Sequence, residues 1–159
     1  MQEDHLKSLR THVLELLKGG NAHITPEKVL PDFPESLRGI KVAKFPHTAW
    51  QLLEHLRIAQ WDILEFTRNA DHKSPPWPKG YWPKTEVPPD RHAWKKSMDQ
   101  FFADLKAMEQ LVASPSTDLF ANLPHGDGQT VLREALVLAD HNSYHLGQIE
   151  AVRKALEGE

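Results

Sequence analysis

The 159-residue chain contains no cysteine. This absence excludes disulfide bonds, zinc sites built on thiolates and a cysteine nucleophile, so a metal bound by the chain must be held by nitrogen and oxygen atoms. The chain also has no apolar run approaching the roughly 20 residues that a membrane-spanning helix needs, and we expect no membrane partner. Its N-terminal segment is charged throughout and lacks the apolar centre of a secretory signal. These features predict a soluble, cytoplasmic protein.

A large excess of one charge is missing as well. The 19 basic and 22 acidic residues are interspersed, and the formal net charge is -3. Nucleic-acid-binding proteins usually carry a basic surface, so we expect neither DNA nor RNA as a partner. With 40% hydrophobic and 26% charged residues, the composition is that of an ordinary globular protein. The length predicts a single domain, residues 1–159.

Alternating apolar residues and hairpin turns, the signals of β-strands, are missing too. Apolar residues recur instead at helical spacing in four long segments, about residues 3–18, 47–68, 91–113 and 130–156. Thr25 followed by Pro26 predicts a short extra helix after the first segment, and Thr130 fits the N-cap of the last. The predicted fold class is therefore all-α, a four-helix bundle with long crossover connections.

The connection between the second and third helices, residues 71–90, holds six of the 12 prolines. Proline at this density prevents a helix. Because long structureless connections are uncommon in compact domains, we expect an ordered cap anchored by Trp77, Tyr81 and Trp82. These rings could pin the segment to the bundle or line a pocket, and the sequence leaves both readings open.

Two histidines stand four residues apart in the last predicted helix. His141 and His145 lie on one helical face, so two ring nitrogens can converge on one cation. The same face carries Leu138 and Val152, which indicates that it is turned toward an apolar surface.

A third candidate ligand is His55, in the apolar stripe of the second helix. A buried imidazole without a hydrogen-bond partner costs about 1 to 3 kcal/mol. A backbone carbonyl would satisfy a single buried ring, whereas a shared metal ion would satisfy all three. Since two inward-facing histidines lie on a facing helix, we predict a divalent-metal site formed by His55, His141 and His145, with an open position for water or substrate.

Other polar residues receive no catalytic role, and the catalytic residues stay unknown. Asn142 stands where zinc proteases carry a glutamate base, which argues against proteolysis. The carboxylates of Glu54, Asp62 and Glu134 lie too far along their helices, or point away, to reach the ion directly. His47 lies two turns from His55 and is not expected to bind the same ion. The remaining histidines are expected at the surface: His5, His12, His23, His72, His92 and His125.

A second stripe of the last helix lies roughly opposite the histidine pair and consists of Leu132, Leu136, Ala139, Ser143 and Leu146. A helix that is apolar on two faces is buried on two sides. The second face could contact another copy of the chain, and a homodimer is our hypothesis.

The position of His55, together with the HNSYHLGQ run at residues 141–148, resembles the DinB superfamily of DinB/YfiT-like proteins. The resemblance covers nearly the whole chain and implies a metal-binding four-helix bundle with His55, His141 and His145 as ligands. It also implies zinc or nickel as the ion, frequent dimers, and activities that include thiol-dependent transferases and an isomerase.

The resemblance and the residues together lead us to expect a metal-dependent transferase. It would transfer a low-molecular-weight thiol to an electrophilic small molecule, because a bound ion lowers the pKa of a thiol and the chain has no cysteine of its own. Two alternatives stay open. One is a metal-dependent hydrolase that uses a metal-bound water, and the other is a non-catalytic metal-binding or stress-related interaction module.

Overall fold

The computed structural model describes residues 2–158, and in this part of the chain every regular element is a helix. The all-α prediction is therefore confirmed. The long helices are α1 (Gln2–Lys18), α3 (Ala49–Arg68), α4 (Ala93–Ala113) and α5 (Val131–Glu157). The short ones are α2 (Pro26–Val29) and two 3-10 turns, η1 (Glu35–Leu37) and η2 (Lys79–Tyr81).

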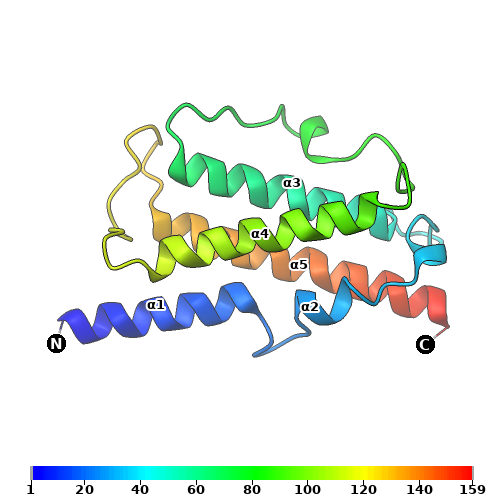
Figure 1. Ribbon diagram of the computed structural model, residues 1–159, viewed down its shortest axis with the longest axis horizontal. Helices are drawn as coiled ribbons and strands as arrows, with labels where there is room; N and C mark the ends of the chain where they lie inside the picture. The colour runs from blue at the N-terminus through cyan, green and yellow to red at the C-terminus, as the bar shows by residue number, and fades with distance from the viewer. Residues whose placement is uncertain (1, 159) are drawn as a thin grey trace.

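The four long helices lie side by side with their axes along the long dimension of the molecule (Figure 1). The chain runs in one direction along α1 and α5 and in the opposite direction along α3 and α4 (Figure 1). Helix α3 packs against α4 and α5, and α1 packs against the same two helices. Because α3 and α4 are parallel, the segment that joins them must return along the whole length of α3. This is one of the long crossovers that the sequence predicts.

The core fills the space between the four helices. Its fully buried side chains include Leu56 of α3, Phe101 and Met108 of α4, and Leu138 and Ile149 of α5. Each such side chain stabilises the fold by about 1.5 to 3 kcal/mol relative to an exposed one. This packing fixes α3 against α5, the two helices that carry the three histidines.

Two helix starts differ from the prediction. Helix α3 begins at Ala49 and not at His47, because Thr48 adopts extended backbone and its hydroxyl accepts a hydrogen bond from the Gln51 backbone N–H at 3.2 Å. Helix α4 begins at Ala93, since Asp90 forms a turn there and accepts a bond from the His92 backbone N–H at 2.7 Å. The predicted cap at Thr130 and the short helix at Pro26 are confirmed.

The proline-rich connection differs from the prediction at two points. It contains the 3-10 turn η2, whereas the sequence predicted no helix in residues 71–90. Trp77 is no anchor, because its side chain is 78% exposed, whereas Tyr81 and Trp82 are partly buried against the bundle. Two of the three expected aromatic anchors, Tyr81 at the end of η2 and Trp82 after it, therefore hold the segment against the bundle.

The second stripe of α5 is covered in large part by the same chain. Ala139 and Leu146 are buried, and α1 and α2 pack against α5, while Leu136 is 41% exposed. Intramolecular packing thus accounts for most of the stripe, and the homodimer stays a prediction. None of the described helices is both long enough and apolar enough to cross a membrane.

Candidate metal centre

The structure brings His55 of α3 together with His141 and His145 of α5. The Nε2 atom of His55 lies 3.1 Å from Nε2 of His145 and 3.1 Å from Nε2 of His141. One ring nitrogen from each histidine lies within 4.8 Å of the other two, a grouping that could hold a metal ion. Helical spacing aligns the two α5 rings, and the packing of α3 on α5 supplies the third.

The Nδ1 atoms of two of these rings are hydrogen-bonded to acceptors. His55 Nδ1 donates to the backbone carbonyl of Tyr81 at 2.8 Å, and His145 Nδ1 donates to Oε1 of Gln148 at 2.8 Å. A neutral imidazole has one N–H, so Nε2 of both rings carries a lone pair. Two lone pairs 3.1 Å apart repel each other unless a cation lies between them. The donor set therefore fits a metal ion.

Burial keeps the three rings neutral. His55 and His145 are 4% and 9% exposed. Burial, together with a smaller effect of the neighbouring histidines, lowers the pKa of His55 to about 4 and that of His141 to about 3. Burial also lowers the pKa of His145. Near neutral pH all three rings are therefore available as ligands, because protons do not compete for Nε2.

The third ring differs from the other two at its second nitrogen. His141 Nδ1 is buried and has no hydrogen-bond partner in the described part of the chain. Its ring contacts those of His55 and His145, with centroids 4.9 and 4.5 Å away.

An indole lies flat against His55. The rings of Trp82 and His55 are parallel within 2°, with centroids 4.0 Å apart. Trp82 also stacks with His47 at 3.9 Å, and His47 is half-buried. His47 is not among the converging ligands, and the Trp82 ring stacks on both His47 and His55.

The carboxylate of Asp62 anchors the proline-rich connection two turns further along α3. Its oxygens accept hydrogen bonds from the Tyr81 hydroxyl at 2.6 Å and from His72 Nε2 at 2.7 Å. The His72 side chain is only 7% exposed. The prediction of a surface position for His72 is therefore wrong, because this loop residue folds back to pair with a buried carboxylate.

Asn142, in the position of the protease glutamate, points into the core. It is buried, and its amide donates to Oε1 of Gln60 at 2.7 Å, while Gln60 donates to the Phe101 carbonyl. The Asn142 side chain therefore links α5 to α3 and α4 through Gln60.

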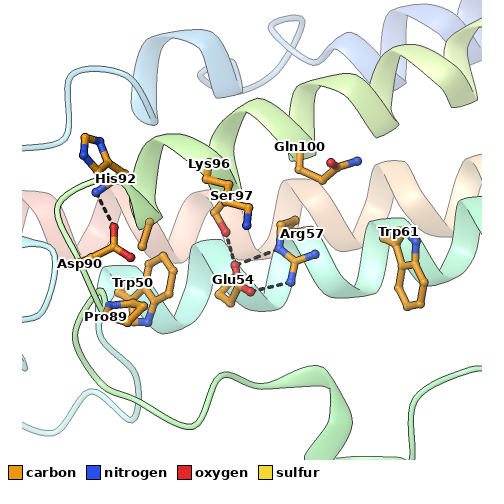
Figure 2. Close-up of a pocket in the computed structure, with 11 residues that line it drawn as sticks. Trp50, Glu54, Arg57, Trp61, Pro89, Asp90, His92, Lys96, Ser97 and Gln100 are labelled. Carbon is orange, nitrogen blue, oxygen red and sulfur yellow. Dashed lines mark hydrogen bonds and ion pairs between the residues drawn. The ribbon is translucent and has the colours of Figure 1, made fainter.

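Glu54 is also engaged away from the histidines. A groove of about 570 Å³ runs between α3 and α4, and Trp50, Glu54 and Trp61 lie along its α3 side (Figure 2). Within it, Glu54 accepts hydrogen bonds from Arg57 at 2.9 Å and from the Ser97 hydroxyl (Figure 2). The three histidines do not line this groove. Glu54 is therefore held by its neighbours on another face of α3.

Sequence reasoning missed three contacts of the site. The Tyr81 carbonyl is a backbone atom, so no residue type announces it. Trp82 was expected to pin the crossover or to line a pocket, and its stacking on His55 depends on how the crossover returns along α3. Gln148 stands three residues after His145, a helical neighbour spacing, and this signal could have identified it as the partner of Nδ1.

Comparison with known proteins bears on the same residues. The model of the DinB superfamily matches residues 11–149 of the chain, a range that includes all three histidines. No curated protein and no solved structure matches the chain significantly.

Proposed function

This chain belongs to the DinB superfamily, and we propose that His55, His141 and His145 bind a divalent metal ion, zinc or nickel. We propose further that the protein is a metal-dependent enzyme that transfers a low-molecular-weight thiol to an electrophilic small molecule. The observation that carries the metal proposal is the pair of Nε2 lone pairs of His55 and His145, 3.1 Å apart. A cation between them removes their repulsion and uses both nitrogens.

The charge of the site supports an anionic nucleophile. The acceptors that hold His55 and His145 are a carbonyl and an amide oxygen, both neutral. Three neutral imidazoles leave the full charge of a divalent ion uncompensated. When bound, such an ion lowers the pKa of a thiol or water at an open position. A free thiol needs a smaller shift than water to ionise at neutral pH, since its pKa is about 8.5.

The proposed reaction balances without a residue that changes its charge. The S–H bond of the thiol breaks and its proton passes to solvent. The sulfur forms a bond to the electrophilic carbon, and the leaving group departs with its electron pair. The chain contributes neutral ligands and the partly buried Trp82 ring beside them, which shields His55 from water.

Metal content of the purified protein tests the ligand assignment. We expect one ion per chain in the wild type and almost none in His145→Ala, because a ligand is lost. The matched control is His12→Ala, which removes an exposed histidine on α1 whose side chain is 69% exposed. Elemental analysis that finds equal metal in wild type and His145→Ala would contradict the site.

A thiol-consumption assay tests the reaction. We expect glutathione or cysteine to be consumed with a chlorodinitrobenzene by the metal-loaded wild type, and not by the chelated protein or His145→Ala. Metal-dependent hydrolysis of esters or amides without a thiol would favour the hydrolase alternative. A metal-loaded protein inactive in both assays would favour a non-catalytic metal-binding module.

A further inference from the structure

The buried carboxylate of Asp62 connects the metal centre to the crossover. Asp62 is 8% exposed and lies seven residues after His55, roughly 10 Å along α3, too far for it to bind the same ion. Each of its oxygens accepts one hydrogen bond, from Tyr81 and from His72, and both donors belong to the connection between α3 and α4. Asp62 therefore clamps this connection onto α3.

Tyr81 is held at both ends. Its hydroxyl donates to Asp62 at 2.6 Å, and its backbone carbonyl accepts from His55 Nδ1 at 2.8 Å. Both partners are on α3, so the residue bridges two points of one helix. The next residue, Trp82, stacks on the His55 ring at 4.0 Å. A displacement of Tyr81 would therefore move both the acceptor of His55 and the ring packed on it.

We propose that Asp62 and Tyr81 are positioning residues of the metal centre. Asp62 holds the Tyr81 hydroxyl, which places the Tyr81 carbonyl where it fixes His55 as the Nδ1–H tautomer with Nε2 facing the ion. This proposal rests on the metal-binding function proposed above. It extends that function, because Asp62 does not contact His55 and yet determines the tautomer of this ligand through Tyr81.

The positioning role rests on the two tautomers that a neutral imidazole can adopt. Without an acceptor at Nδ1, the proton can occupy either nitrogen, and only one of the two tautomers presents a lone pair at Nε2. Loss of such an outer hydrogen bond typically weakens metal binding by about 10- to 100-fold. The Tyr81 carbonyl cannot be removed by substitution, but its position can be released through the hydroxyl.

The Tyr81 hydroxyl keeps its proton and so remains a hydrogen-bond donor to Asp62. Burial and the hydrogen bond to Asp62 raise the pKa of Tyr81 to about 12. The phenol therefore stays protonated throughout the pH range in which the histidines bind metal.

The test compares Tyr81→Phe with Tyr144→Phe. These are the two tyrosines of the chain, and each substitution removes one hydroxyl group. The ring of Tyr144 lies 4.9 Å from that of His145, and its side chain is 65% exposed. Affinity for Zn²⁺ is measured by competition with a chelator, and coordination geometry by the visible spectrum of the Co²⁺-loaded protein. The His55 tautomer is read from ring ¹⁵N chemical shifts of the metal-free protein.

We expect Tyr81→Phe to weaken Zn²⁺ binding by about 10- to 100-fold, to alter the Co²⁺ spectrum, and to give His55 a mixture of tautomers. Tyr144→Phe should bind within about twofold of the wild type, with an unchanged spectrum. Asp62→Asn provides a second variant. The asparagine amide has one acceptor oxygen in place of two, so it cannot reproduce the separate bonds that the two carboxylate oxygens accept from Tyr81 and His72. It should shift the His55 ring signals in the same direction as Tyr81→Phe.

Two failures are distinguishable. If Tyr81→Phe and Asp62→Asn keep wild-type affinity, spectrum and tautomer, the positioning role is wrong while metal binding by the wild type stands. If the wild type binds no metal, the proposed function is wrong, and the positioning of the ring is still decided by the tautomer of His55 in the metal-free variants.

Discussion

Two of the three histidine rings, His55 and His145, are buried as neutral groups whose Nε2 lone pairs face each other, and His141 is partly buried beside them. His55 and His145 each use Nδ1 to satisfy an oxygen acceptor, which leaves Nε2 without a proton. The burial that makes this arrangement costly for the metal-free protein also excludes protons from the ligands. The same three histidines therefore favour binding of a metal cation and resist protonation.

This cost predicts a pH dependence of the metal-free protein. The pKa is about 4 for His55 and about 3 for His141 in the folded state, below the ordinary value of 6.5. Between these values and 6.5 the unfolded chain binds more protons than the folded one, so stability present above pH 6.5 is lost as the pH falls. Each histidine contributes a slope of up to about 1.4 kcal/mol per pH unit.

Urea unfolding of the chelated protein between pH 6.5 and 5 measures this slope. The variant His141→Gln removes one titrating group and should show a shallower dependence than the wild type. Carboxylates add the same background to both proteins in this range. Parallel curves for the two proteins would contradict the lowered pKa of His141.

At the level of single residues, the sequence predicted what residue type and helical period encode. His55, His141 and His145 stand in apolar stripes, and a buried imidazole needs a partner, so their grouping could be inferred. The Tyr81 carbonyl could not, because every residue has one. His72 was placed at the surface because it lies in a polar loop, and its pairing with Asp62 depends on how that loop folds back.

Among the elements, α3 is joined at its first turn to the crossover that follows it. Its N-cap Thr48 completes a capping box with Gln51, and the Thr48 hydroxyl also donates to the Glu86 carbonyl at 2.6 Å. Glu86 belongs to the crossover that carries Tyr81 and Trp82. The start of α3 and the end of the crossover are therefore joined through one hydroxyl group.

Replacing this hydroxyl should cost more than replacing an ordinary cap. Loss of a threonine cap typically costs about 1 kcal/mol, and Thr130→Ala at the start of α5 should cost about that amount. Thr48→Ala also leaves the Glu86 carbonyl without its donor, so we expect a loss of about 2 kcal/mol in the free energy of unfolding. Urea unfolding of both variants decides the comparison, and equal losses would show that the link to Glu86 contributes nothing.

The crossover marks the limit of prediction for elements. Its prolines predicted a segment without helix, whereas the structure contains the 3-10 turn η2 at Lys79–Tyr81. The sequence could not separate Trp77 from Tyr81 and Trp82, since all three are aromatic residues in the same polar setting. Only the return path along α3 decides that Trp77 is exposed while Tyr81 reaches Asp62.

For the whole molecule, the metal centre ties together segments far apart in the chain. His55 and His145 are 90 residues apart and belong to α3 and α5, which pack against each other in the bundle. An ion held by both helices binds the folded state and not the unfolded chain, in which the ligands are dispersed. Metal binding should therefore stabilise the entire fold by mass action.

With free metal at about 1,000 times the dissociation constant, this stabilisation is about 4 kcal/mol, which corresponds to a rise in Tm of roughly 8 to 16 °C for a domain of this size. Thermal unfolding of the wild type, chelated and then reloaded with Zn²⁺ or Ni²⁺, measures the rise. His145→Ala should show almost no rise in Tm, because α5 loses one of its two proposed ligands. His12→Ala should match the wild type. An equal rise in His145→Ala would mean that the metal stabilises the protein at another place, since the link between α3 and α5 would then not be the origin of the effect.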